Sequence, residues 1–295
     1  MANVNSTQRL AQALEIIAAD TEDADNEYTI TITGDITLTE AGHLININPV
    51  ANTGFQGKKI TITDNNSGKR LILGANRIGA VITVGGSGSL PAGTEATVIL
   101  TGTLTVVGAG TQETPNNAPL VKMARNGIFE LDGSAKLTGN TARQGAGVNL
   151  ESRGKFYMKG GEISGNTIIG SFPGCGVYSS PGNNGAFEMS GGVIAGNRAV
   201  VVYEYNDLYK YHGTAGVYAS GVFRKTGGII YGNEDAVAEQ LRNTIIAEHP
   251  VINTSAVYYE KSMVLYYKGT TLWQSDSVNS ESPEDGLIRY EDEAQ

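Results

Sequence analysis

The feature that most constrains this 295-residue chain is a repeated block that ends in the dipeptide Gly-Asn. Each block begins with a phenylalanine and carries an aliphatic residue three positions before its asparagine. The blocks occupy residues 129–141, 156–167, 187–198 and 223–234. The intervals between them are uneven, although the blocks themselves hardly change. Constant repeats with variable connections are typical of a solenoid whose strands are fixed and whose corner loops accept insertions.

Two-residue alternation inside the blocks predicts short β-strands. Phe156 and Met158 face one way while Tyr157 and Lys159 face the other, which is the pattern of a half-buried strand. Glycine then turns the chain. Three such strands in each repeat would form three stacked faces, so the predicted fold class is all-β, a parallel β-helix. Upstream of residue 129 the repeat fades, but β-rich runs bounded by turn residues continue.

The repeated asparagines are predicted to have a structural role. Asparagine tolerates the left-handed backbone conformation that tight corners require. One asparagine at the same corner of each coil would also stack into a ladder of side-chain amides. Ligand binding is the alternative. The four positions are Asn140, Asn166, Asn197 and Asn233.

A different pattern precedes the strands. Leu10, Leu14 and Ile17 recur at helical spacing, and Ser6 or Thr7 can cap the N-terminus of a helix. A short amphipathic helix here would cover the open end of a β-helix, which otherwise exposes its core and an unpaired strand edge. The sequence is therefore predicted to comprise an N-terminal capping helix and lead-in (1–27), the parallel β-helix (28–273) and a polar, acidic C-terminal tail (274–295).

Composition and charge exclude several classes of protein. The chain carries 30 acidic and 21 basic side chains, a formal net charge of −9, so it is a poor partner for nucleic acid, whose phosphates need cations. A single cysteine excludes a disulfide framework and a cysteine-based zinc site. No apolar run is long enough for a membrane-spanning helix, so we expect no membrane insertion. Residues 1–9 lack the features of a secretory signal, which leaves either a cytoplasmic location or a signal already removed.

The sequence contains no recognisable catalytic motif. A glycoside hydrolase needs two carboxyl groups about 5–9.5 Å apart. Glu130 and Glu188 occupy the same strand position in their blocks, but Tyr157 lies between them on the intervening coil. Cys175 lies at a predicted corner without a basic neighbour that would activate its thiol, and it is expected to be a buried or half-buried small residue. The sequence therefore predicts no catalytic residue, no metal site and no cofactor.

The longest insertion, residues 199–213, is rich in tyrosine. Its strand–turn–strand pattern predicts a β-hairpin that projects from a corner. Tyrosine offers a flat apolar ring and a hydroxyl group, which suit a sugar or a protein surface. The alternative is that the hairpin folds down and packs its rings on the outer face. The candidate binding residues are Tyr203, Tyr205, Tyr209, Tyr211 and, in a repeated Gly-Val-Tyr motif, Tyr218.

The blocks GGEISGNT and FEMSGGVIAGN resemble the GGxISGNT-type repeats of bacterial β-helix surface proteins, which are abundant in spirochaetes and gut bacteria. The similarity is clearest over residues 119–234 and looser upstream. It implies a right-handed parallel β-helix displayed outside the cell, extracellular or on the cell surface, with adhesin-like or unknown roles. The motif brings no catalytic residues with it. The uneven repeat spacing and the long insertion depart from the family's pattern.

Three functions are carried forward as hypotheses. The first is a non-enzymatic, adhesin-like binding module, secreted or on the cell surface, that recognises a glycan or a host or matrix protein through its outer face. The second is a polysaccharide-active lyase or hydrolase, because such enzymes use the same pectate-lyase-like fold, although fold alone does not carry activity. The third is a passive structural scaffold. Three or more acids around one groove would favour an enzyme, and exposed coplanar tyrosines would favour binding.

Overall fold

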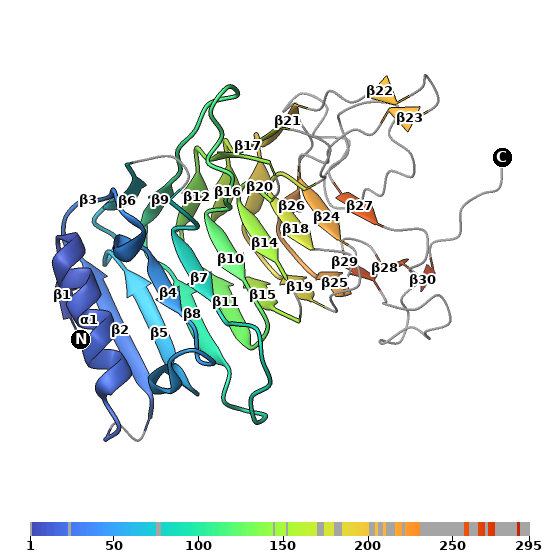
Figure 1. Cartoon of the computed structure of the whole chain (residues 1–295). Coiled ribbons are helices and arrows are strands. Elements are labelled where there is room, and N and C mark those ends of the chain that lie inside the picture. Colours follow the sequence, from blue (N-terminus) through green and yellow to red (C-terminus); the bar gives the residue numbers. More distant parts are fainter. Residues whose placement is uncertain are drawn as a thin grey trace.

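The computed structural model describes most of the first 230 residues and four short strands beyond them. The described residues are 2–230 without 23–24, 75–77, 144, 152, 170–173, 180–184, 201–203, 206–208, 211–215 and 220–221, together with strands at 257–259, 265–268, 271–274 and 288–289. Within them the chain is mostly β, with one α-helix and long sheets of parallel strands (Figure 1). Two 3₁₀ turns, Ala41–His43 and Thr53–Phe55, contact the helix.

Three sheets, named A, B and C here, contain most of the described strands. Sheet A contains β1 (Ala2–Val4), β2 (Glu27–Ile32), β5 (Lys59–Thr63), β8 (Ala96–Leu100), β11 (Gly127–Leu131), β15 (Lys155–Met158), β19 (Ala186–Met189), β25 (Val222–Lys225), β29 (Thr271–Gln274), β28 (Leu265–Lys268) and β30 (Ile288–Arg289). Sheet B contains β3 (Ile36–Leu38), β6 (Arg70–Leu73), β9 (Thr105–Val107), β12 (Lys136–Thr138), β16 (Glu162–Ser164), β20 (Val193–Ala195) and β26 (Ile229–Ile230). Sheet C contains β4 (Ile45–Ile47), β7 (Ile82–Val84), β10 (Val121–Met123), β14 (Val148–Leu150), β18 (Val177–Ser179), β24 (Val217–Ala219) and β27 (Val257–Tyr259). Sheet D, which is smaller, holds β13 (Thr141–Ala142), β17 (Thr167–Ile169) and β21 (Arg198–Val200), and a separate pair holds β22 (Glu204–Tyr205) and β23 (Tyr209–Lys210).

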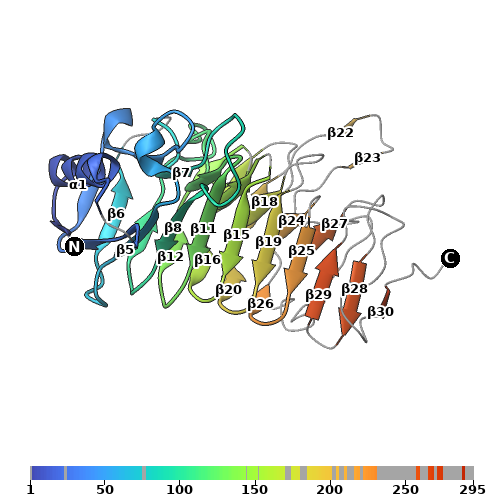
Figure 2. The ribbon, with the colours of Figure 1, turned by 90° about the horizontal axis from the view of Figure 1, so that it is seen from below.

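Successive strands visit sheets A, B and C in turn, so that equivalent strands stack on one another. For example, β5 in sheet A is followed by β6 in sheet B and β7 in sheet C before β8 returns to sheet A. We call each such passage a circuit. In sheet A, neighbouring circuits pair in parallel from β2 to β25 (Figure 2), and β29 then joins β25 in the antiparallel sense. The arrangement is consistent with a parallel β-helix or solenoid, and it confirms the prediction of a mostly β fold with stacked parallel strands.

The helix α1 (Thr7–Ala19) packs at the end of the sheets where β1 and β2 lie (Figure 1). Ser6 caps it through a hydrogen bond of 3.3 Å from a first-turn backbone N–H to its hydroxyl oxygen. Leu10, Ala13 and Ile17 are buried, which confirms the predicted amphipathic helix. A short strand that the sequence pattern does not predict, β1, precedes the helix and pairs in parallel with β2.

A buried cation joins the C-terminal end of α1 to sheet A. The Lys58 side chain is buried, and its Nζ donates hydrogen bonds to the backbone carbonyls of Ile17 and Asp20. The same Nζ lies 3.3 Å from the Tyr28 hydroxyl and 4.8 Å from the centre of that ring. Carbonyl groups at a helix C-terminus carry partial negative charge and stabilise a nearby cation. The helix is therefore held by electrostatic contacts as well as by its apolar stripe.

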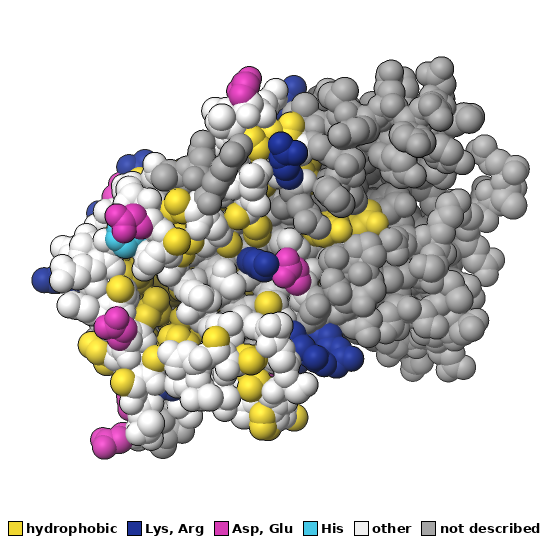
Figure 3. Space-filling view, in the orientation of Figure 1, with side chains coloured by type: hydrophobic (Ala, Val, Ile, Leu, Met, Phe, Trp, Pro, Cys, Tyr) yellow, Lys and Arg dark blue, Asp and Glu magenta, His cyan; other side chains and the backbone are white. Residues whose placement is uncertain are grey.

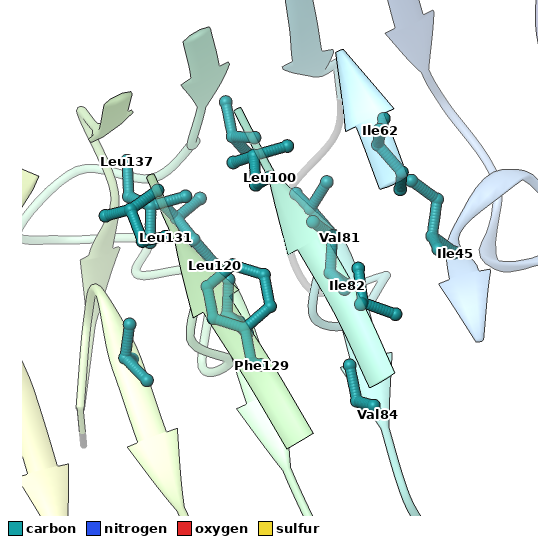
Figure 4. Close-up of a cluster of buried hydrophobic side chains, with 14 of the residues drawn as sticks. Ile45, Ile62, Val81, Ile82, Val84, Leu100, Leu120, Phe129, Leu131 and Leu137 are labelled. Atoms are coloured by element: carbon teal, nitrogen blue, oxygen red, sulfur yellow. The ribbon is translucent and has the colours of Figure 1, made fainter. Parts of the chain in front are cut away.

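The main core lies between the sheets and is built from columns of inward-facing side chains. Figure 4 shows Ile82, Leu131 and Leu137, from sheets C, A and B respectively, gathered in one interior. One column of sheet A contains, circuit by circuit, Ile60, Val98, Phe129, Phe156, Phe187 and Phe223. Successive phenylalanine rings have centroids 5.7, 4.8 and 5.1 Å apart, and all four are buried. The predicted inward orientation of these phenylalanines is confirmed.

A ladder of asparagine side chains runs along the corners that follow sheet B. Its members Asn116, Asn140, Asn166 and Asn197 are fully buried or nearly so. The side-chain amide of Asn116 donates to Oδ1 of Asn140 at 3.2 Å. The backbone N–H of Asn140 in turn donates to Oδ1 of Asn166, and that of Asn166 to Oδ1 of Asn197, both at 3.1 Å. The predicted ladder is confirmed for these corners and extends upstream to Asn116, while Asn233 lies outside the described residues.

The left-handed residue at these corners is the glycine before each asparagine, which corrects the conformation predicted for asparagine. Gly139, Gly165 and Gly196 have φ angles of 73°, 63° and 60°, whereas the asparagines that follow them have no positive φ. Glycine enters this region without a steric cost because it lacks a Cβ. The two residues of the Gly-Asn dipeptide thus have different roles. The glycine allows the backbone to turn, and the asparagine supplies the side-chain amide of the ladder.

Candidate functional site

A pocket of about 260 Å³, which we call the corner pocket, lies where three connections from sheet C to sheet A meet. These connections comprise residues 85–95, residues 124–126 and the residues just before β15, and they lead into β8, β11 and β15. The lining includes Ser89, Leu90, Glu95, Arg125, Asn126, Gly127, Ile128, Arg153 and Lys155. Polar groups and aliphatic side chains therefore share one open cavity at the edge of sheet A.

Strand register brings the walls of the corner pocket together. Ile128 of β11 pairs with Lys155 of β15, so the turns that precede these strands stack on one another. The longer connection 85–95 is attached to them, because Asn126 Nδ2 donates to the backbone carbonyl of Gly88 at 3.1 Å. The pocket is thus positioned by neighbouring strands of a sheet and by a direct bond between two of its loops.

The corner pocket carries more basic than acidic side chains. Lys155 Nζ lies 3.8 Å from Glu95 Oε1, and the other oxygen of Glu95 accepts a hydrogen bond from the Gly93 N–H at 3.0 Å. Arg125 and Arg153 form no ion pair with any residue that the structure describes. On the face seen in Figure 3, Lys and Arg side chains gather near its lower edge. A chain with a net charge of −9 therefore presents a locally positive site.

Arg153 adopts a backbone conformation that few residues of its size adopt. Its φ is 64°, and Asn126, which holds the same place before a glycine in the preceding corner, has a φ of 65°. The left-handed conformation costs a residue with a Cβ about 1–2 kcal/mol, and asparagine enters it more readily than most. Residues held in such conformations cluster at functional sites. The arginine at this corner is therefore a candidate binding residue rather than a favourable choice for the turn.

A second, smaller pocket of about 120 Å³ opens on the outer face of sheet A. Register places Glu130, Tyr157 and Glu188 side by side on successive circuits, as the sequence predicts. Burial, and after it the Glu188 carboxylate, raises the pKa of the Tyr157 hydroxyl above its ordinary value. Lys159 Nζ lies 2.7 Å from Glu130 Oε2. Glu188 is the one acid among the residues that line this pocket, and Glu130 lies two circuits away with Tyr157 between them, so the site has fewer than the three acids that would favour an enzyme.

The five candidate tyrosines are described to different extents. Tyr205 and Tyr209 pair across the antiparallel strands β22 and β23, which confirms the pairing expected of a hairpin. Tyr203 and Tyr211 lie outside the described residues. Tyr218 is 8% exposed, and its ring stacks on that of Tyr178 with 5.4 Å between centroids. The role of these tyrosines in binding stays a prediction, with little of the Tyr218 ring open to solvent.

The single cysteine belongs to a small second core beneath sheet D. Cys175 is buried with Ala142, Ala146 and Ile168. Its Sγ donates a hydrogen bond of 3.0 Å to the backbone carbonyl of Asn166. Burial raises the pKa of the Cys175 thiol to about 12, which keeps it protonated and unreactive at neutral pH. The prediction of a buried, structural cysteine is confirmed.

The corner pocket is absent from the sequence-based predictions, although the sequence contains a signal for part of it. The segments ARNG (124–127) and SRG (152–154) each place an arginine shortly before the glycine that leads into a strand of sheet A. Aligning the phenylalanines Phe129 and Phe156 would have placed these arginines in adjacent corners. The sequence does not indicate that the connection 85–95 also lines the pocket, because this connection is not part of a repeat that would predict its path.

Three further findings concern metals, membranes and known proteins. The residues that the structure describes contain no group of three or more His, Cys, Asp or Glu side chains placed to share a metal ion. None of their helices has the length and apolar character needed to cross a bilayer. No protein-family model, curated protein or solved structure matches the chain. The site is therefore interpreted from its own chemistry.

Proposed function

We propose that this chain is a non-enzymatic, adhesin-like binding module, secreted or displayed on a cell surface, that recognises a glycan or a protein through its outer face. In this proposal the body is a right-handed parallel β-helix. Its fold is supported by three sheets of parallel strands visited in a constant order. The observation that carries the function is the corner pocket, where Arg125 and Arg153 face an open cavity without an ion-pair partner among the described residues.

The residues of the corner pocket suit recognition of a polar ligand. Arginine donates five hydrogen bonds in a fixed planar arrangement. Glu95 supplies an acceptor, Ser89 a hydroxyl group, and Leu90 an apolar contact. A few well-placed polar groups with apolar neighbours are usual in ligand sites. The tyrosine-rich insertion 199–213 would be a second contact region of the same module.

A binding array of glycans and matrix proteins tests the proposal. We expect saturable binding by the full chain, reduced at least tenfold in the double variant Arg125→Ala/Arg153→Ala. The matched control is Arg9→Ala/Arg143→Ala, which removes the same charge from two exposed residues outside the pocket lining. A second variant, Tyr205→Ala/Tyr209→Ala, measures the contribution of the insertion. Absence of binding across a broad panel would contradict the proposal and favour the passive scaffold.

A polysaccharide-active enzyme is the second candidate function, and one observation favours it. Glu130 and Glu188 flank Tyr157 on the outer face of sheet A, beside a pocket. Two carboxyl groups on one face can act as an acid and a base on a glycosidic bond, and here the Tyr157 side chain stands between them. Release of reducing ends from a panel of polysaccharides, abolished in Glu188→Gln, would support this function and replace the binding proposal.

A further inference from the structure

We infer that the corner pocket binds the carboxylate of an acidic sugar unit, an inference that rests on the proposed binding function and names its ligand class. Three of the lining side chains are basic and one is acidic: Arg125, Arg153 and Lys155 against Glu95. The single acid is partly neutralised by Lys155 at 3.8 Å. The two arginines therefore supply positive charge that no described residue compensates.

The two arginines come from adjacent corners, so they can approach one anion from two sides. Their strands are neighbours in sheet A, with Ile128 beside Lys155. The guanidinium fork matches a planar carboxylate and binds it through two parallel hydrogen bonds. Arg153 occupies its corner in spite of the conformational cost at a φ of 64°. Asn126 occupies the equivalent position in the preceding corner. Binding of an anion by the guanidinium group would explain why Arg153 occurs at this position instead of asparagine.

The surroundings favour a single negative charge over a polyanion. The whole chain has a net charge of −9, so a long polyanion would be repelled away from this site. Glu95 lies in the lining itself, so part of the lining repels a ligand that carries many negative groups. The pocket therefore fits an isolated carboxylate better than a nucleic acid or another long polyanion.

The remaining lining groups favour a sugar as the carrier of the carboxylate. Ser89 and the Oδ1 of Asn126 can bind hydroxyl groups, since Asn126 uses its Nδ2 to hold Gly88. Leu90 and Ile128 provide small apolar areas against which the C–H face of a sugar ring can pack. Glu95 can accept a further hydroxyl hydrogen bond. A hydroxyl-rich unit uses all of these groups, whereas an acidic peptide side chain would leave several of them without a partner.

Isothermal titration of the full chain with matched oligosaccharides tests the inference. The probes are oligosaccharides that end in glucuronate, in glucose or in a sulfated glucose. We expect the glucuronate probe to bind at least tenfold more tightly than the neutral probe, and its affinity to fall as salt rises. Equal affinity for the glucuronate and neutral probes would overturn the inference, as would clear preference for the sulfated probe.

Three variants separate binding from folding. Arg153→Asn places the preferred residue at the left-handed corner, so the fold should be kept or stabilised while glucuronate affinity drops about tenfold or more. Glu95→Gln removes the opposing carboxylate and should raise that affinity several-fold. The control Arg9→Ala/Arg143→Ala should leave it unchanged. Unaltered glucuronate binding in Arg153→Asn and in Arg125→Ala would overturn the inference.

The outcome also distinguishes this inference from the proposed function. Saturable binding of neutral glycans or proteins, unaffected by Arg125→Ala/Arg153→Ala, would keep the binding function and reject the acidic-sugar pocket. Failure of the folded wild-type chain to bind any glycan or protein would reject both.

Discussion

The circuits from β2 to β9 and the circuits from β11 to β26 share the same three sheets but are held together by different side chains. In the sheet A column, the upstream circuits contribute Ile60 and Val98, whereas the downstream circuits stack four phenylalanines. The asparagine ladder begins at Asn116, in the corner after β9, and continues through the corners downstream of it. Parallel pairing of the strands therefore requires only alternating apolar residues, whereas the amide ladder requires an asparagine at the same corner position in every circuit.

The turn from sheet A to sheet B shows the same contrast. After β5, Asp64 is buried and its carboxylate accepts hydrogen bonds from the backbone N–H groups of Asn66, Lys69 and Thr103. Downstream, glycine pairs make the equivalent turn after β15 and β19. A Cβ on Gly191 would lie 2.2 Å from the Lys159 carbonyl oxygen, so only glycine fits there. The upstream turn is therefore stabilised by hydrogen bonds to the Asp64 carboxylate, whereas the downstream turns depend on glycine because a side chain would not fit.

The largest effect is expected from breaking the phenylalanine column. Phe156→Ala removes a buried ring between two stacked rings and should lower the free energy of unfolding by about 3–5 kcal/mol. Val98→Ala, in the upstream part of the same column, should cost about 2 kcal/mol or less because less surface is lost. Urea denaturation of both variants checks this. Equal losses would mean that the two halves of the column contribute alike, and the comparison would fail.

A smaller effect is expected from the asparagine ladder. Asn166→Ala removes the acceptor of the Asn140 N–H and leaves buried groups without partners, which should cost about 2–3 kcal/mol. The upstream control Asn46→Ala changes an exposed residue of β4 and should stay within about 0.5 kcal/mol. Hydrogen exchange should show faster exchange at the amide of Asn140 in the first variant only. Unchanged protection there would show that the ladder adds no stability.

The smallest effect is expected from the charged upstream turn, and it depends on pH. Burial alone would raise the pKa of Asp64, but hydrogen bonds from Thr103, Lys69 and Asn66 outweigh it and hold the pKa below its usual value. A carboxyl group whose pKa is lower in the folded state stabilises the fold fully above its unfolded pKa of about 3.9 and loses that contribution as the pH falls through the folded value. Asp64→Asn should therefore cost about 1–2 kcal/mol at pH 7 and much less near pH 2.

Stability measured between pH 2 and pH 7 checks the prediction for Asp64. The control is Asp132→Asn in the equivalent turn after β11, which should change stability by less than about 0.5 kcal/mol. A difference between wild type and Asp64→Asn that does not shrink at low pH would contradict the role assigned to the carboxylate.

Features that repeat in the sequence could be predicted, because the same residue types recur at equivalent positions and indicate the same structural environment in each circuit. The inward phenylalanines and the asparagine ladder follow from this repetition, and the single capping helix follows from the helical spacing of its apolar residues. The residue types predict the left-handed conformation for the wrong member of the Gly-Asn pair, because both asparagine and glycine tolerate that conformation. The corner pocket could not be predicted, because it depends on the path of the single-copy connection 85–95. Aligning Phe129 with Phe156 places Arg125 and Arg153 in adjacent corners, but that alignment does not show that the connection 85–95 closes a cavity with them.

The constant order of the strands has a consequence for how the chain acquires its structure. Paired residues of neighbouring sheet A strands are 27 residues apart in one case (Phe129 and Phe156) and 38 in another (Ile60 and Val98). Each circuit therefore needs only its predecessor as a template, and folding can propagate along the chain once one circuit exists. During synthesis the N-terminal circuits emerge first. We expect each new circuit to dock as it leaves the ribosome, so that the growing edge of the sheets advances with translation.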